Sequence, residues 1–340
     1  MKKYDVIIAG ASFAGLAVAS RIKNKKVLLI DREYIGSHVR SACGTTVRLM
    51  KNINCEKSIL QAFNKAALHI KNQEIDIPLI EKYCTIEYKK FCKLFNKQND
   101  AKFIKASVKS TDGKIVYTDK GNFEADIIVD CTGWNAVLAS SLKKGYVNKK
   151  MMSFGIETEI PYKKDNKLRF FLDKNIIKNG SGWLFPCGKK ARFGVASYKG
   201  ETKLLPNLKK LLNKYNLQEG KIHGGYFCYC LKEPVIKNIF VVGCAAGQTL
   251  PLTGEGIRRS VYFGLRCGEI IQKILNKEIS LKQGQEEYKK ITLKYNNRYR
   301  FLLEFQNKLP KTPNWEIDLI AKLLSIKPIS IITSNWYEKI

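Results

Sequence analysis

The sequence has little of what metal-binding and secreted proteins rely on. Its 340 residues include 10 cysteines and 3 histidines, and the cysteines are scattered without a CxxC pair. This spacing argues against a zinc or iron–sulfur site and against a disulfide framework, and it predicts reduced thiols in a cytoplasm. No apolar run approaches the roughly 18–20 residues of a membrane span. A strand is expected from residue 4, so no signal peptide is predicted.

Acidic residues are also scarce. The chain carries 60 Lys and Arg against 30 Asp and Glu, a formal net charge of +30. Lysines are spread along the whole sequence, which favours a solvated basic surface from a biased composition. The alternative is attraction to an anionic membrane surface or to nucleic acid. No zinc finger, RNP motif or other nucleic-acid-binding module is recognisable in the sequence.

The N-terminal stretch KYDVIIAGASFAGLAVASRIKNKKVLLID, residues 3–31, predicts a βαβ unit. A strand at Tyr4–Ala9 leads through a glycine turn into a helix from Ala14 to about Lys23. A second strand at Val27–Ile30 ends in Asp31. All of this fits within about 30 residues, as dinucleotide folds require.

The residues in and after this turn are of the kinds that bind a dinucleotide. Gly10 permits the tight turn, and Gly15 lets the helix pack closely on the sheet. Ser12 stands where a second glycine normally lets the backbone approach a pyrophosphate. The helix N-terminus offers N–H groups and a positive dipole end to phosphate, and Asp31 can accept hydrogen bonds from ribose hydroxyls. The motif therefore predicts dinucleotide binding without separating FAD from NAD.

The nucleotide domain returns twice later in the chain. A hairpin signal at Asp112–Gly113 precedes a buried strand at Ile127–Val129, and a further buried strand at Ile239–Val242 precedes a helix to about Asn276. We therefore expect an α/β fold with a discontinuous nucleotide domain. Its segments are predicted at 1–50, 111–150 and 236–276, with a mostly helical insertion at 51–110, an antiparallel β substrate domain at 151–235 and a helical basic segment at 277–340.

A glycine-rich stretch follows the last buried strand. It reads GCAAG at 243–247 and PLTGEGI at 251–257 and opens a helix. Gly256, Ser260, Gly264 and Gly268 recur every four residues, which predicts a stripe of small residues for close packing against the sheet or a cofactor. Incidental glycines are the alternative, although each one inside a helix costs about 1 kcal/mol relative to alanine.

Three motifs in this order resemble the FAD motifs of the p-hydroxybenzoate hydroxylase-type flavoproteins. They are the first glycine turn with Asp31, DCTG at 130–133, and the GCAAG…PLTGEGI stretch. Within that group, Cys43-Gly44, GWLFP at 182–186 and PLTGEG are most similar to the geranylgeranyl reductase family. The resemblance covers about residues 1–275. It implies a glutathione-reductase-like Rossmann domain that binds FAD, an inserted antiparallel sheet, and reduction of isoprenoid double bonds.

The resemblance also assigns residues. Cys43 and Gly44 are the catalytic candidates, with the Cys43 thiol beside the isoalloxazine as a proton donor or a residue that shapes the pocket. The helix opening at Gly254 would aim its positive end at the flavin N1/C2 carbonyl. The cofactor-binding candidates are Gly10, Ser12, Phe13, Ala14, Gly15, Asp31, Arg32, Arg40, Cys43, Asp130, Thr132, Gly133, Gly243, Cys244, Gly247, Gly254, Glu255, Gly256 and Ile257.

Other candidates are weaker. Trp183, Phe185 and Pro186 either wall an apolar substrate pocket or belong to an ordinary core. Arg40 is preferred to Arg48 as a pyrophosphate ligand. His38 and His223 are secondary acid–base candidates, and no metal site is expected.

Four positions depart from the family pattern. Ser12 replaces a glycine, and Asp31 replaces the usual Glu but offers the same acceptors. Cys244 stands where the third motif normally has Asp, and a thiol cannot accept hydrogen bonds comparably. Ser181 replaces the aromatic residue that the family places before the GWxFP segment, which changes the expected substrate pocket more than the fold.

We therefore expect an FAD-dependent oxidoreductase, monomeric and cytoplasmic, that reduces C=C bonds of a prenyl lipid. Reduced flavin N5 would deliver hydride, with NAD(P)H or a ferredoxin-type protein as electron donor. The C-terminal segment carries Ile317, Ile320, Ala321 and Leu324 at helical spacing, to pack on the body or to contact a membrane surface. One alternative is a monooxygenase or halogenase on the same fold, although only WLFP matches the WxWxIP segment of halogenases. The other is a non-catalytic or RNA-associated flavoprotein.

Overall fold

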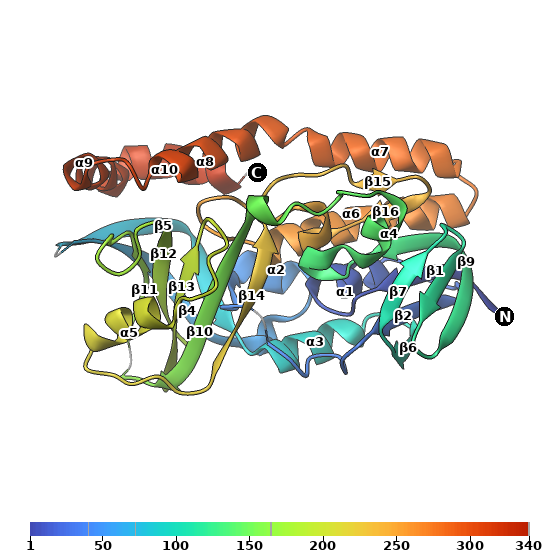
Figure 1. Ribbon diagram of the computed structural model, residues 1–340, viewed down its shortest axis with the longest axis horizontal. Helices are drawn as coiled ribbons and strands as arrows, with labels where there is room; N and C mark the ends of the chain where they lie inside the picture. The colour runs from blue at the N-terminus through green and yellow to red at the C-terminus, as the bar shows by residue number, and fades with distance from the viewer. Residues whose placement is uncertain (40, 72, 164, 339–340) are drawn as a thin grey trace. The chain divides into compact units, whose positions relative to one another are not determined.

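The computed structural model describes residues 1–39, 41–71, 73–163 and 165–338 and divides into two compact units (Figure 1). Each unit is assembled from three segments of the chain. The first unit comprises Met1–His38, Tyr88–Lys149 and Phe227–Arg300. The second unit comprises Val39–Glu87, Lys150–Tyr226 and Phe301–Ile340.

The first unit is built on a sheet with the strand order β15-β16-β9-β1-β2-β6. The pairs from β16 to β6 are parallel, with Ala9 aligned to both Ile30 and Asp130. Because parallel strands end at the same edge, the loops after β1, β2, β9 and β16 lie along one edge of the sheet. The strands are β1 (Lys2–Ala9), β2 (Val27–Asp31), β6 (Lys102–Lys105), β7 (Val108–Thr111), β8 (Ile115–Thr118), β9 (Gly121–Asp130), β15 (Val235–Ile236) and β16 (Ile239–Val241).

Helices cover this sheet. Among them, α1 and α6 pack against each other, as Figure 1 shows. A Cβ on Gly264 would lie 2.6 Å from the Cβ of Ala17 and 2.7 Å from the carbonyl oxygen of Ala14. The stripe of small residues on α6 therefore packs against helix α1, whereas the sequence predicted packing against the sheet or a cofactor. The helices are α1 (Phe13–Ser20), α3 (Tyr88–Asn96), α4 (Val137–Leu142), α6 (Ile257–Leu275), α7 (Leu281–Leu293) and the start of α8 (Asn296–Lys308), with short 3-10 turns η2 (Gly133–Asn135) and η4 (Gly243–Ala246).

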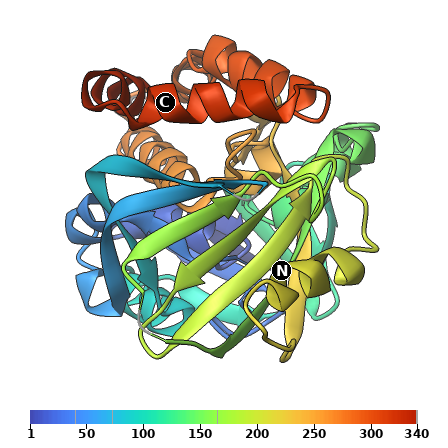
Figure 2. The same ribbon diagram turned by 90° about the vertical axis from the view of Figure 1, so that its left-hand side faces the viewer.

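The second unit is built on a mixed sheet with the strand order β14-β10-β13-β12-β11-β4-β5-β3. Figure 2 looks onto this sheet, where the blue hairpin β4–β5 lies beside the green strands. Helix α5 (Leu205–Asn213) buries Leu208, Leu211 and Leu212 in its core. The strands are β3 (Gly44–Thr46), β4 (Ile59–Ile70), β5 (Gln73–Ile86), β10 (Met152–Pro161), β11 (Lys167–Phe171), β12 (Gly180–Pro186), β13 (Lys190–Ser197) and β14 (Ile222–Cys228).

The remaining elements of the second unit are short turns and helices. They are α2 (Val47–Asn52), η1 (Glu56–Ser58), η3 (Lys149–Met151), α9 (Asn314–Ser325) and α10 (Lys327–Glu338). None of the helices that the structure describes combines the length and hydrophobicity that crossing a bilayer requires. The α/β class and the helical C-terminus are as the sequence predicts.

The predicted helical insertion at 51–110 is wrong. Two of the longest strands of the chain, β4 and β5, occupy most of it, and α3 is its longest helix. The β4 sequence ILQAFNKAALHI is rich in helix-forming residues. Its pairing with β5 on one side and with β11 on the other overrides that propensity.

The unit boundaries also differ from the predicted domains. Residues 39–50 belong to the second unit and residues 88–110 to the first. The C-terminal segment divides after Arg300. The sheet predicted as antiparallel at 151–235 extends beyond that range and contains a parallel pair, β11 with β4, because a strand from the second segment of that unit joins a hairpin from the first.

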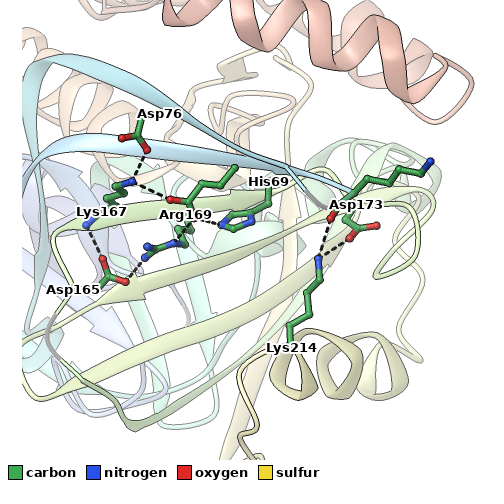
Figure 3. A network of polar contacts seen from close by, with 9 residues as sticks. His69, Asp76, Asp165, Lys167, Arg169, Asp173 and Lys214 are labelled. Carbon is green, nitrogen blue, oxygen red and sulfur yellow. Dashed lines mark hydrogen bonds and ion pairs between the residues drawn. The ribbon is translucent and has the colours of Figure 1, made fainter.

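A polar network holds the junction of β4, β5 and β11 (Figure 3). Glu74 accepts hydrogen bonds from Lys167 Nζ at 2.9 Å and from Arg169 Nε at 3.0 Å, and His69 Nε2 lies 2.7 Å from it. Arg169 also pairs with Asp165. Burial opposes the ionisation of Glu74, but the two cationic donors outweigh it and lower its pKa to about 2. The network therefore remains charged at neutral pH and binds the parallel strand pair.

The close contacts of two helical glycines predict different costs for an added Cβ. Gly264→Ala should lower the free energy of unfolding by about 1–3 kcal/mol, because its Cβ meets backbone and a neighbouring Cβ. Gly284→Ala, in α7, places its Cβ 2.5–3.0 Å from side-chain atoms of Ile274 and Ile270 and meets no backbone within that distance, so it should cost less than Gly264→Ala, and the higher helix propensity of alanine offsets about 1 kcal/mol. Thermal unfolding of both variants measures this, and an equal or higher Tm for Gly264→Ala would contradict the packing.

Candidate active site

The predicted glycine motifs converge at the edge of the first unit's sheet. Gly10 has φ +106°, and any side chain there would clash with the carbonyl oxygen of Cys131. The amide of Cys131 in turn donates to Ala9 O at 2.7 Å. Gly243, with φ +72°, approaches α1 so closely that a Cβ would lie 2.8 Å from the Cβ of Ala14. Three loops distant in sequence therefore meet around the start of α1.

The start of α1 is left open to an anion. Ser12 is its N-cap residue, but its hydroxyl pairs with the Tyr88 hydroxyl at 2.9 Å, and no described side chain caps the helix. A side chain at Gly15 would clash with the Gly10 carbonyl oxygen. Phe13 packs against the rings of Tyr88 and Phe91. The backbone N–H groups of the first turn of α1 therefore remain available to donate hydrogen bonds to a phosphate group.

Asp31 stands at the end of β2 beside this turn. One carboxylate oxygen accepts from the Ala11 amide at 2.7 Å, and the other accepts from the Glu33 amide at 3.0 Å. Each oxygen has a second lone pair, so the carboxylate can still accept from ribose hydroxyls. Arg32 is exposed, and Arg40, the predicted pyrophosphate ligand, lies outside the described residues.

The second motif uses its polar side chains internally. Asp130 is fully buried and accepts from the amide and hydroxyl of Thr132 and from the Ala139 amide, at 2.7–2.9 Å. Thr132 Oγ1 accepts from the Val137 amide at 2.7 Å. Burial raises the pKa of Asp130. These two side chains brace the loop, so what the DCTG motif can offer a cofactor is chiefly the backbone around Gly133, which has φ +77°.

The third motif is shaped by residues that sequence reasoning missed. Gln248 is buried, accepts from the Gly243 amide at 2.6 Å and donates to Tyr288 Oη at 3.2 Å. The hydroxyl of Tyr299 donates to the Gln248 carbonyl at 2.8 Å. Gln248 is a polar residue in an otherwise apolar run, which is the one sequence signal for this network. The tyrosines come from C-terminal helices that no motif connects to the loop.

The last part of the third motif opens α6. Gly254 has φ +65°, and Gly256 is the N-cap residue, with no side-chain cap among the described residues. Both carboxylate oxygens of Glu255 accept from Arg258, at 2.6 and 2.8 Å, so this carboxylate belongs to its own helix turn. Ile257 is buried. At Gly247, with φ +68°, a side chain would clash with the Cys230 carbonyl oxygen.

Cys244 is not an isolated replacement for an aspartate. Its Sγ accepts from the Cys228 amide at 3.2 Å. The Cys244 thiol therefore accepts the hydrogen bond of the Cys228 amide, which an aspartate at this position could also accept. The loop that carries Cys228 is thereby tied to the third motif.

The Cys43-Gly44 motif lies in the second unit. Cys43 is fully buried with φ +54°, and its Sγ donates to Ser41 O at 3.2 Å. Burial raises its pKa to about 12, against the opposing positive charge of Arg192. The buried guanidinium of Arg192 donates to Ala42 O at 3.1 Å and pairs with Glu159 at 3.0 Å. Cys43 is therefore a protonated thiol on a loop that Arg192 holds.

The GWLFP motif meets the same loop. A Cβ on Gly44 would lie 3.1 Å from the ring of Phe185. Trp183, half-buried on the same face of β12, donates its indole N–H to buried Glu157 at 2.6 Å. His223 Nε2 lies 3.1 Å from the other Glu157 oxygen without hydrogen-bond geometry.

The other predicted residues lie apart from this cluster. Pro186 follows Phe185 directly, so it faces the opposite side of β12 and does not share a wall with Trp183 and Phe185. His38 is exposed in the first unit and lies 3.5 Å from Glu33. Arg192 and Glu157 were missed by sequence reasoning, although a charged residue inside an apolar strand pattern is a usable signal. Among the described residues, no group of His, Cys, Asp or Glu is arranged to hold a metal ion.

Known proteins resemble the chain over most of its length. No protein-family model matches it. It is 26% identical to a digeranylgeranylglycerophospholipid reductase of Methanococcus vannielii, over 94% of this chain and 90% of that protein. A protein of the same name from Methanococcus aeolicus is also 26% identical, over the same shares.

Solved structures share the fold. A geranylgeranyl bacteriochlorophyll reductase-like protein from Thermoplasma acidophilum superposes with a TM-score of 0.85 at 18% identity, covering 96% of this chain and 92% of that one. PqsL, a probable FAD-dependent monooxygenase of Pseudomonas aeruginosa, has a TM-score of 0.71 at 12% identity, with 91% and 96% covered. The myxobacterial halogenase CndH has a TM-score of 0.70 at 15% identity, with 90% and 83% covered. The chain is therefore similar in sequence to digeranylgeranylglycerophospholipid reductases over most of its length, and it shares the fold of a geranylgeranyl bacteriochlorophyll reductase-like protein and of FAD-dependent enzymes.

Proposed function

We propose that this protein reduces C=C double bonds of a prenyl lipid, with NAD(P)H or a ferredoxin-type protein as electron donor. The observation that carries the proposal is the buried, protonated Cys43 thiol on a loop held by Arg192. It supplies a proton donor of the kind that saturation of a double bond needs. Similarity to digeranylgeranylglycerophospholipid reductases over 94% of the chain supports the substrate class.

The first unit fits FAD. The open N-terminus of α1 would hold the pyrophosphate, and Asp31 would accept from the ribose. Gly10, Gly15 and Gly243 let the loops approach one another and the start of α1 more closely than any Cβ would allow. When bound, FAD supplies hydride transfer. The chain's residues position it and exclude water.

Cys43 would provide the proton for the substrate carbon. Its Sγ holds that proton at neutral pH because burial raises the pKa to about 12. After transfer, the thiolate would lie in the field of the Arg192 guanidinium, whose charge favours the anionic form. Arg192 therefore both positions the loop and stabilises the state left after proton donation.

Trp183, which is half-buried, would present apolar surface to the lipid, and Phe185 would support it from a buried cluster with Phe63 and Leu168. Trp183 and Phe185 share one face of β12, and Glu157 fixes the Trp183 ring through its indole N–H. Packing of Phe185 on Gly44 places this face beside the Cys43 loop. A prenyl chain, which offers only apolar surface and double bonds, suits such a wall.

A monooxygenase or halogenase activity is the second candidate. PqsL and CndH share the fold. Neither reaction requires a thiol that donates a proton to carbon, so the Cys43 site favours the reductase. A non-catalytic or RNA-associated role would instead show as salt-dependent RNA binding without turnover.

Replacing Cys43 tests the reductase directly. Cys43→Ala should keep its FAD but slow re-oxidation of the dithionite-reduced flavin by a geranylgeranyl lipid by about 10²–10⁴-fold, the usual contribution of a positioned acid. Anaerobic stopped-flow absorbance measures the rate. Cys84→Ala is the matched control, because Cys84 is an equally buried thiol of the same unit with its pKa also raised to about 12.

Two outcomes would contradict the proposal. Parent-like rates in Cys43→Ala would remove Cys43 from catalysis. If the parent protein shows no re-oxidation by prenyl lipids but hydroxylates an aromatic substrate with molecular oxygen, the monooxygenase candidate replaces the reductase.

Cys244 offers a test of cofactor binding. Cys244→Asp should bind FAD at least as tightly as the parent, because a carboxylate can accept from the Cys228 amide and still offer acceptors to the cofactor. Cys244→Asn is the uncharged control and should show no gain. Equilibrium dialysis with FAD measures both. Weaker binding by Cys244→Asp at unchanged Tm would show that the thiol is required as it stands.

We also propose that α9 contacts an anionic membrane surface. Of the residues predicted at helical spacing, Ile317 and Ala321 are buried and Ile320 and Leu324 are half-buried, whereas Trp315, Leu319 and Leu323 beside them are 67%, 52% and 43% exposed. Exposed Lys322, whose Nζ lies 3.8 Å from Asp318 Oδ2, and exposed Lys327 flank the stripe of Trp315, Leu319 and Leu323. An exposed apolar stripe beside lysines, on a chain of net charge +30, suits a surface of anionic lipids.

Vesicle sedimentation tests this surface. The protein should bind vesicles containing phosphatidylglycerol more than vesicles of phosphatidylcholine alone, with binding reduced by salt. Leu319→Asp combined with Leu323→Asp should abolish it. Leu205→Asp, at an exposed leucine of α5, should bind like the parent. Unchanged binding by the double variant would place the contact elsewhere.

A further inference from the structure

Two loops of the first unit are locked together around a pair of thiols. The amide of Lys232 donates to Ala246 O at 3.0 Å, and Gly247 packs on the backbone of Cys230. These contacts bring Cys228, at the end of β14, against Cys244 in the third motif. The Cys228 amide donates to Cys244 Sγ at 3.2 Å, and the Cys228 thiol donates to the Trp134 carbonyl oxygen at 3.7 Å.

A cation faces this pair. Lys232 Nζ lies 3.6 Å from Cys228 Sγ and 5.2 Å from the centre of the Tyr146 ring, which restricts its position. The titratable groups around Cys228 are Cys244, Lys232, Cys230 and Tyr146. Hydrogen bonding from Cys244 and the charge of Lys232 outweigh burial and lower the pKa of Cys228 to about 7. In contrast, burial raises the pKa of Cys43, Cys131, Cys230 and Cys267.

We propose that Cys228 and Cys244 form a peroxide-sensitive thiol pair that closes to a disulfide in the third glycine motif. The geometry supplies both partners: a nucleophilic sulfur beside an ammonium group and a second thiol in contact with it. Cys228 is 1% exposed, whereas Cys244 is partly exposed, so a molecule as small as hydrogen peroxide would approach from the Cys244 side.

The oxidation balances with hydrogen peroxide alone. The Cys228 thiolate attacks one peroxide oxygen, the O–O bond breaks, and sulfenic acid and hydroxide form. Lys232 can donate a hydrogen bond to the departing hydroxide. The Cys244 sulfur then attacks the sulfenic sulfur, the S–O bond breaks, and the Cys244 proton leaves with the oxygen as water. The two sulfurs lose two electrons, which the peroxide receives.

Closure would change the third motif whatever substrate the protein acts on. The new S–S bond would reorient the Cys244 sulfur, so that it could no longer accept the hydrogen bond of the Cys228 amide in the same geometry. The loop that carries Lys232 would be covalently tied to η4. The pair therefore makes this part of the first unit responsive to oxidation.

Mass spectrometry of the full chain tests the pair. The protein is treated with a few equivalents of hydrogen peroxide, alkylated under non-reducing conditions and digested. A disulfide between the peptides of Cys228 and Cys244, reversed by dithiothreitol, is expected. Cys244→Ser should stop at a Cys228 sulfenic acid that dimedone traps, and Cys230→Ser, a thiol in the same loop, should still form the disulfide.

The rate supplies a second readout that does not depend on cysteine variants folding. Disulfide formation in the parent should accelerate as pH rises through about 7, as the Cys228 thiolate forms. Lys232→Met should slow it about fivefold at pH 7, because a one-unit rise in pKa lowers the thiolate fraction from about a half to about a tenth. Oxidation of Cys230 or other cysteines before this pair, or a rate unaffected by Lys232→Met, would overturn the proposal.

Discussion

Close approach of backbone to backbone at glycine positions is the constraint on which the first unit depends. Gly10 packs on the carbonyl of Cys131, Gly15 packs on Gly10, and Gly264 packs on α1. Parallel strands bring their ends to one edge, but the loops that follow converge only where no Cβ separates them. The arrangement proposed to bind the cofactor therefore rests on the close approach of these loops and on free N–H groups more than on charged side chains.

Buried polar groups hold that arrangement without facing a ligand. Asp130 braces the second motif and Gln248 the third, and both are satisfied within the unit. Arg192 does the same for the Cys43 loop in the second unit. A buried charge is costly unless it is paired, so these residues have little capacity left for a substrate. These residues hold loops in position. Motif comparison finds Asp130 because it lies in the DCTG motif, and it overlooks Arg192 because that residue lies outside the motifs.

Environment separates the two functional cysteines. Burial keeps Cys43 a thiol, with a pKa of about 12, whereas Cys244 and Lys232 bring the pKa of Cys228 to about 7. The first suits proton donation and the second suits nucleophilic attack, although both are buried. The roles proposed for Cys43 and Cys228 therefore differ because their surroundings differ.

The sequence by itself determined the βαβ unit, the α/β class and the order of the three motifs, because turn glycines and hydrophobic periodicity reflect local structure. It misled at β4, whose helix-forming residues become a strand only through pairing with β5 and β11. The tertiary structure alone decided that Tyr288 and Tyr299 reach the third motif. It alone brought Arg192 to the Cys43 loop and Cys228 to Cys244. These partners lie far apart along the chain and meet only when the sheets assemble, so no local pattern could encode them.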